Sequence, residues 1–222
     1  KTRAACSGLR RKDEQGGTAL SQTDTNSNHP EWFDPAMPER ERCVVPALLE
    51  HYAVATPGKT FVLFEDGSEW TYAETLERTR AAAGALRDLG VGPGDVVLAW
   101  LPNGPEILLT WFAANYLGAI LAPINTSYRG KLLHHVVCQS GATTLVGHAD
   151  LLPRLRQIDA TQLRDIVCCN GPVTAAAAPR GVALHAGTLL GEASAGEIQA
   201  YPVERWDTMM IVYTSGTTGP SK

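Results

Sequence analysis

Between residues 95 and 169, short apolar runs alternate with stretches whose apolar residues recur at helical spacing. The runs DVVLAWL (95–101), AILAPIN (119–125), ATTLVG (142–147) and RDIVCC (164–169) are apolar nearly throughout rather than at every second position. Strands with this pattern are buried on both faces, as in parallel sheets. The alternation therefore predicts an α/β fold in which helices flank a mainly parallel sheet.

Helices are expected between these runs, at 105–118, 129–141 and 149–158, and ahead of them at 44–56. Pro105 suits the first turn of its helix, where its missing N–H has no intrahelical partner to lose. The longest apolar stretches of the chain thus belong to buried helices and strands.

A β-hairpin and a capped helix are expected between the first helix and the alternating region. The runs TFVLF and EWTY flank Asp66 and Gly67, a pair typical of tight hairpin turns. Thr71 and Glu74 have the spacing of a capping box, so a helix is predicted from there to Gly90.

The pattern weakens after residue 169. LHAGTLLGEAS (184–194) is a candidate helix, and YPVERWD (201–207) is expected to be a connecting segment. TMMIVY (208–213) is predicted to form one more buried strand, because it is again apolar throughout.

Residues 1–30 combine charges, glycines and the polar run SQTDTNSN with almost no large apolar side chains. Such a segment buries too little surface to offset the entropy of ordering it, so we expect a flexible extension. Residues 31–222 are expected to form part of one domain. Because the chain begins at Lys1 rather than at methionine, we expect it to be a fragment.

Composition excludes several classes of function. The formal net charge is −4 and the basic residues are scattered, so no surface for nucleic acid is expected. Neither an apolar run of about 18 residues nor a signal peptide is present, which predicts a soluble, cytoplasmic protein without a transmembrane segment. Five cysteines form no metal-binding pattern, and a metal pair at His134 and His135 is not expected because adjacent helix positions point apart.

The run TSGTTGPSK closes the sequence directly after the last apolar run. Glycines at a strand end let several backbone N–H groups converge on one anion, while Ser and Thr add hydroxyl donors and Lys adds a positive charge. The spacing is not that of a Walker A loop, because Gly216, Gly219 and Lys222 are separated by three positions each time. An exposed turn of ordinary composition is the alternative interpretation from these residue types alone.

YTSGTTGPSK resembles the phosphate-binding motif of the adenylate-forming enzymes, the family of acyl-CoA synthetases, nonribosomal-peptide adenylation domains and luciferases. Ser221 stands where proline is commonest in that motif. The resemblance extends upstream through GVGPGDVV, LPN and GAILAPIN, and covers about residues 45–222. PINTSYRGKLLHHVV is most similar to the acyl-CoA or crotonobetaine/carnitine-CoA ligase branch.

The resemblance implies an AMP-forming acid–thiol ligase, in which a carboxylic acid and ATP give an acyl-adenylate before transfer to CoA, with Mg²⁺ assisting. It implies that the loop residues hold the β- and γ-phosphates of ATP and that the lysine neutralises their charge. These cofactor-binding residues are Thr214, Ser215, Gly216, Thr217, Thr218, Gly219 and Lys222. Arg129 is interpreted as part of a solvated helix start, with a contact to the phosphates of CoA as the alternative.

The family's segments for adenine, ribose and the catalytic lysine would follow Lys222, so no catalytic residue is assigned. We expect the chain alone to be inactive as a ligase, and no metal-ligating residue is assigned. A noncatalytic α/β nucleotide-binding module is the alternative function. An unrelated phosphotransferase is disfavoured by the loop spacing.

Overall fold

A computed structural model of the protein describes residues 29–174, 179–191 and 198–213. The predicted loop residues 214–222 and the predicted extension up to residue 28 lie outside this part of the chain. The chain divides into two units, Lys1–Phe33 and Asp34–Lys222. In the described end of the first unit, the N–H of Phe33 donates to the carbonyl of Pro30 at 3.0 Å.

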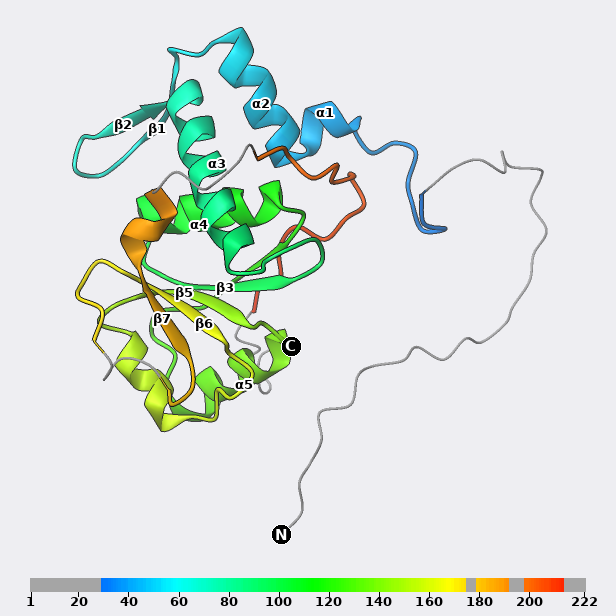
Figure 1. The fold of residues 1–222 in the computed structure, drawn as a ribbon. Helices are drawn as coiled ribbons and strands as arrows, with labels where there is room; N and C mark the ends of the chain where they lie inside the picture. Colours follow the sequence, from blue (N-terminus) through cyan, green and yellow to red (C-terminus); the bar gives the residue numbers. More distant parts are fainter. Residues whose placement is uncertain (1–28, 175–178, 192–197, 214–222) are drawn as a thin grey trace, which may run out of the picture. The chain divides into compact units, whose positions relative to one another are not determined.

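All helices and strands of the described residues belong to the second unit (Figure 1). In chain order, with η for 3-10 helices, they are α1 (Arg40–Cys43), α2 (Val45–Ala55), β1 (Thr60–Leu63), β2 (Glu69–Thr71), α3 (Tyr72–Asp88), β3 (Val96–Trp100), α4 (Pro105–Tyr116), β4 (Ile120–Pro123), α5 (Gly130–Ser140), β5 (Thr144–His148), η1 (Leu152–Gln157), β6 (Asp165–Cys169), β7 (Ala183–Ala186) and η3 (Gly187–Gly191). None of these helices is both long enough and apolar enough to cross a membrane.

Within the described residues, five strands form one parallel sheet in the order β4-β3-β5-β6-β7. The predicted α/β class is confirmed, and the parallel direction follows from the helices that connect successive strands. β3 lies inside the sheet, where Leu98 is in register with Ala122 of β4 and with Leu145 of β5. The continuous apolar runs of the sequence are the buried strands of this sheet.

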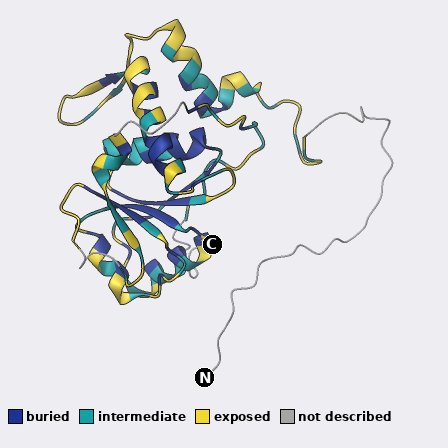
Figure 2. Ribbon diagram, viewed as in Figure 1, coloured by how far each residue is buried: buried dark blue, intermediate teal, exposed yellow. Residues whose placement is uncertain are grey.

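Two apolar clusters cover the two faces of the sheet, because successive side chains of a strand point to opposite faces. Val97 and Val146 pack in one cluster with residues of α2, α3 and α4. Leu98 and Leu145 pack in the other with residues of α5 and η1. Figure 1 shows α3 and α4 on one side of the sheet and α5 on the other. Figure 2 shows that α4 and the inner strands are mostly buried.

The start of α3 is the predicted capping box. The Glu74 N–H donates to the Thr71 hydroxyl oxygen at 3.2 Å, and the Thr71 N–H donates to the Glu74 carboxylate at 2.8 Å. These hydrogen bonds to the ionised carboxylate lower the pKa of Glu74. Two helix N–H groups that would otherwise lack partners are thereby satisfied.

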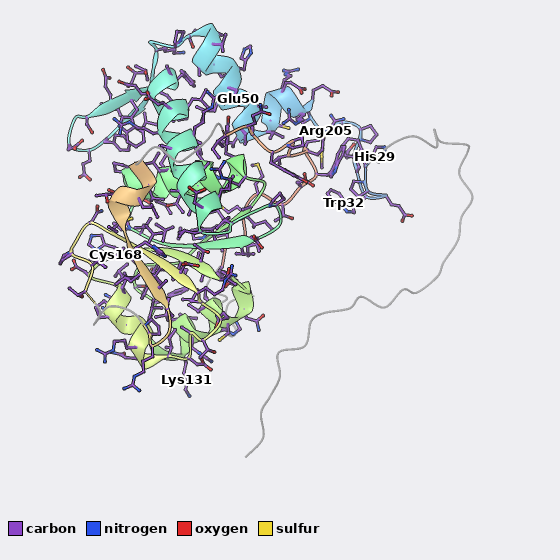
Figure 3. All side chains as sticks on the ribbon, in the orientation of Figure 1. His29, Trp32, Glu50, Lys131, Cys168 and Arg205 are labelled. Atoms are coloured by element: carbon purple, nitrogen blue, oxygen red, sulfur yellow. The ribbon has the colours of Figure 1, made fainter. Side chains whose placement is uncertain are left out.

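A buried tyrosine joins three helices on the first face of the sheet. The Tyr116 hydroxyl of α4 donates to the Glu50 carboxylate of α2 at 2.7 Å and accepts from Nε of Arg80 in α3 at 2.9 Å. Burial is the main cause that raises the pKa of Tyr116, so the hydroxyl keeps its proton. Figure 3 labels Glu50 on α2.

The hairpin predicted between residues 60 and 72 is confirmed as the antiparallel pair β1–β2. In its turn, the N–H and hydroxyl of Ser68 donate to the Asp66 carboxylate at 2.9 and 2.6 Å. The hydroxyl contact is the main cause that lowers the pKa of Asp66. Unlike the central sheet, the hairpin is mostly exposed (Figure 2).

Two sequence predictions after residue 169 need correction. Part of the candidate helix at 184–194 is a strand, β7, which continues the sheet beside β6 before the short 3-10 helix η3 begins. The predicted buried strand at 208–213 is instead a single parallel bridge between Met210 and Leu121. Residues 209–213 are half-buried or exposed, because within the described residues they contact the sheet only at its edge beside β4.

Candidate functional site

The strand order places a topological switch point between β3 and β5. From β3 the chain moves outward to β4 and then returns past β3 to β5. The connection after β3 passes through α4 on one face, and those after β4 and β5 pass through α5 and η1 on the other. Ligands of open α/β sheets bind outside the carboxyl ends of the strands at such a point.

Residues 209–213 lead the chain toward this carboxyl edge. The Leu121 N–H donates to the Met209 carbonyl at 3.0 Å, and the Ile211 N–H donates to the Leu121 carbonyl at 2.8 Å. Because the bridge is parallel, this segment runs in the direction of β4, and Tyr213 comes about level with Ile124 just past that strand. Tyr213, the last described residue before 214–222, therefore lies past the carboxyl end of β4 at the outer edge of the sheet.

Asn115 of α4 fixes the start of this segment. Its Nδ2 donates to the Met209 carbonyl at 2.9 Å and to the Ala119 carbonyl at 3.2 Å. The side chain is almost completely buried, and within the described residues its Oδ1 has no hydrogen-bond partner. Sequence reasoning did not assign a role to Asn115, although a lone amide in the apolar stretch WFAANY was a signal that a polar contact is needed there.

The predicted site residues themselves, Thr214, Ser215, Gly216, Thr217, Thr218, Gly219 and Lys222, lie outside the described residues. Tyr213, which directly precedes them, packs against the same apolar cluster as α5. Its partial burial raises the pKa of its hydroxyl, so the hydroxyl stays protonated at neutral pH.

Other side chains gather at the carboxyl edge near β3 and β4. The guanidinium of Arg154 in η1 lies 5.8 Å from the centre of the Trp100 ring and donates to the Thr126 carbonyl at 2.7 Å. The indole N–H of Trp100 donates to the Asn125 carbonyl at 3.2 Å. These contacts hold the connection between β4 and α5 against the end of β3. From the sequence, Trp100 was predicted only to be a core residue, and these hydrogen-bond and ring contacts were not predicted.

Arg129 lies at the end of that connection, as the N-cap residue of α5. It is exposed and provides no side-chain cap for the helix, which agrees with the solvated helix start expected from the sequence.

In the part of the chain that the structure describes, no three His, Cys, Asp or Glu side chains gather closely enough to hold a metal ion. The two adjacent cysteines predicted to end a buried strand do so, because Cys168 and Cys169 are each 1% exposed (Figure 3 labels Cys168). Burial raises the pKa of the Cys169 thiol to about 12, so it remains protonated and unreactive.

Comparison with known proteins decides the family. The sequence profile described as AMP-binding enzyme matches residues 49–222, which include both the described sheet and the closing motif. The chain belongs to the AMP-binding enzyme family. The predicted resemblance is thereby confirmed.

Two relatives of the chain are named as CoA ligases. 4-Coumarate–CoA ligase 3 from Oryza sativa subsp. japonica is 31% identical over 158 residues, which are 71% of this chain and 27% of that protein. Crotonobetaine/carnitine–CoA ligase from Escherichia coli is 33% identical over 158 residues, which are 70% of this chain and 30% of that protein. The chain thus spans less than a third of the length of these relatives.

A solved structure shows the same fold. The Mycobacterium tuberculosis fatty acyl CoA synthetase superposes with a TM-score of 0.62 at 22% sequence identity, over 80% of this chain and 34% of that one. The chain thus has the α/β fold expected for the N-terminal domain of an adenylate-forming enzyme.

Proposed function

We propose that this chain is the part of an ATP-dependent acid–thiol ligase that binds the triphosphate of ATP. The complete ligase activates a carboxylic acid as an acyl-adenylate and transfers the acyl group to CoA. The observation that carries the proposal is the family match through residue 222, together with the hydrogen bonds that direct residues 209–213 to the carboxyl edge of the sheet.

The donor set of the loop fits a polyphosphate. Gly216 and Gly219 allow the backbone N–H groups to turn toward one anion, and three hydroxyl side chains lie between or beside them. Lys222 adds a charge that attracts the β- and γ-phosphates and stabilises pyrophosphate as it leaves. ATP supplies the α-phosphate that the carboxylate attacks.

We assign no residue of this chain to Mg²⁺, because the described residues offer no carboxylate cluster for it and the motif contains no carboxylate. The carboxylic acid is proposed only as a class, an acid whose acyl-adenylate is taken by CoA. The two relatives described above are named as CoA ligases of organic acids, which supports CoA as the acceptor.

Equilibrium dialysis of the 222-residue chain against ATP tests the proposal. Gly216→Val should abolish binding, because a branched side chain prevents the close approach of the backbone to phosphate. Gly58→Val is the matched control: it is an exposed glycine where a Cβ would have no atom within 4 Å, and it should leave binding unchanged. Equal binding by both variants would contradict the proposed role of the loop.

ATP–pyrophosphate exchange distinguishes the ligase from a noncatalytic nucleotide-binding module. We expect no exchange with the chain alone, and exchange driven by an organic acid when the chain is part of a protein as long as its relatives. ATP binding without acid-dependent exchange in such a protein would favour the noncatalytic module.

A further inference from the structure

Residues 37–40, which lead into α1, lie beside residues 203–205 of the connecting segment that precedes the closing motif, although the two are far apart in the sequence. Each segment donates an arginine to backbone carbonyls of the other. From the first segment, Nε of Arg40 donates to the Val203 carbonyl at 2.6 Å. Figure 1 shows the later segment, in orange-red, running past α1.

Arg205 makes the return contacts. Its Nη1 donates to the carbonyls of Met37 and Pro38 at 2.9 and 3.0 Å and lies 3.5 Å from the Glu39 carboxylate. The Arg205 side chain is only 16% exposed, whereas Glu39 is 75% exposed, so the two carbonyls contribute more than the ion pair at the surface. Figure 3 labels Arg205 beside α1. We call the contacts of Arg40 and Arg205 with these carbonyls the arginine clasp.

The arginine clasp joins a segment outside the family match to one inside it. The match begins at residue 49, so Arg40 and the carbonyls that accept from Arg205 lie ahead of it. Val203 and Arg205 lie within the match, shortly before the closing motif. The clasp is therefore an anchor supplied by this chain in addition to the residues that the family model describes.

A closed turn connects the arginine clasp to Met209. The Asp207 N–H donates to the Glu204 carbonyl at 3.0 Å, and the Glu204 N–H donates to the Asp207 carboxylate at 2.8 Å. One residue separates this turn from Met209, whose carbonyl is held at the sheet edge by the hydrogen bonds described above. A turn closed by two hydrogen bonds has little freedom to absorb a displacement, so the position of residues 203–205 influences that of Met209.

We propose that Arg40 and Arg205 are positioning residues for the phosphate-binding loop. They fix the connecting segment, and the closed turn passes its position on to Met209, from which residues 210–213 lead to the loop. The inference rests on the proposed function, because the ligand of the loop is the triphosphate of ATP. A loop whose entry is fixed in advance loses less conformational freedom on binding, so the clasp strengthens ATP binding.

Hydrogen exchange of the 222-residue chain without ATP tests the positioning. Arg40→Met and Arg205→Met each keep an apolar stem and remove the hydrogen-bond donors. Each should quicken exchange of the Tyr201 amide, which donates to the end of α4 at 2.8 Å, about tenfold, and exchange of the Ile211 amide by a smaller factor. Arg42→Met, at an exposed arginine of α1, is the matched control and should leave both rates unchanged.

ATP affinity tests whether the fixed position matters for the ligand. In equilibrium dialysis, the dissociation constant for ATP should rise about threefold or more in Arg40→Met and Arg205→Met, and should stay unchanged in Arg42→Met. Arg205→Lys should lie between Arg205→Met and the unmodified chain, because an ammonium group still donates to carbonyls. Circular dichroism should show every variant folded, so a general loss of stability does not account for the weaker binding.

Each measurement has an outcome that contradicts the proposal. Unchanged exchange at Tyr201 in both methionine variants of the clasp would overturn the clasp itself. Faster exchange at Tyr201 with an unchanged rate at Ile211 would overturn its connection to the loop. Unchanged ATP affinity despite faster exchange at Ile211 would overturn the positioning role. Absence of ATP binding by the unmodified chain would instead contradict the proposed function, while the exchange rates still decide whether the clasp holds the segment.

Discussion

Two apolar runs of five residues differ in how deeply they are buried in this fold. Four of the five residues of β3, from Val97 to Trp100, are completely buried. Residues 209–213, MMIVY, are just as apolar, yet all are half-buried or exposed and Val212 is 58% exposed. β3 has a strand on each side and helices over both faces, whereas within the described residues the second run makes one bridge to Leu121.

Apolar composition thus permits burial, but neighbouring strands and helices produce it. A strand with partners on both edges has its backbone groups satisfied and its side chains enclosed. Residues 209–213 are instead held by main-chain hydrogen bonds and by the Asn115 amide. Substitutions should therefore be costly in β3 and tolerated in 209–213, except where they remove those hydrogen bonds.

The largest effect is expected for Leu98→Ala in β3. Leu98 is completely buried, so the variant leaves a cavity and should lower the free energy of unfolding by about 2–5 kcal/mol in urea denaturation. Leu63→Ala removes the same atoms from a side chain that is 71% exposed, and it should change stability by less than about 0.5 kcal/mol. Similar losses for both variants would contradict the burial difference.

Asn115→Ala should have the next largest effect, because it removes a buried donor from the Met209 and Ala119 carbonyls. We expect a loss of about 1–3 kcal/mol in the free energy of unfolding. Hydrogen exchange of the Leu121 and Ile211 amides should quicken at the same time, since their bonds hold residues 209–211 to the sheet. Asn103→Ala, at an exposed asparagine, is the control; unchanged exchange in Asn115→Ala would contradict the anchoring role.

A smaller, pH-dependent effect is expected at Cys169 in β6. Burial, with a smaller contribution from the Glu106 carboxylate, raises its pKa from 9.0 to about 12 in the folded chain. Between these values the unfolded chain loses the proton first, so rising pH lowers the stability of the folded state. In Cys169→Ala the free energy of unfolding should fall less steeply between pH 9 and 11 than in the unmodified protein. Parallel profiles would mean that this thiol is not buried as described.

The smallest effect is expected for Val212→Ala in the second run. Because Val212 is 58% exposed and its side chain leaves no cavity, the free energy of unfolding should change by less than about 0.5 kcal/mol. A loss near that of Leu98→Ala would show that residues 209–213 form a buried strand after all, as the sequence alone predicted.

The sequence was sufficient for the elements whose local signals agree with their surroundings. The continuous runs around Leu98 and Val146 gave the parallel sheet, and Thr71 and Glu74 gave the start of α3. β7 was missed because ALHA has no apolar run, and only pairing with β6 makes it a strand. The run MMIVY was wrongly predicted to be a buried strand, because a local sequence pattern does not show which strands and helices will pack against it.

The candidate site was predicted unevenly for a similar reason. The glycines, hydroxyls and lysine of the loop have a recognisable order along the chain, so the motif could be recognised from the sequence without knowledge of the three-dimensional structure. The roles of Asn115 and of the Arg154 contact with Trp100 depend on residues distant in sequence, such as Met209 and Thr126. Those roles became visible only from the folded chain.

Among the described residues of the segment ahead of the motif, the Asn115 amide hydrogen-bonds the Met209 carbonyl, a group that every amino acid possesses. The position at which the chain enters the loop is therefore insensitive to which side chain residue 209 carries. Substitutions of residue 209 should therefore be tolerated, whereas position 115 has to keep an amide side chain. Divergent relatives should show this asymmetry as a variable residue 209 facing an invariant residue 115.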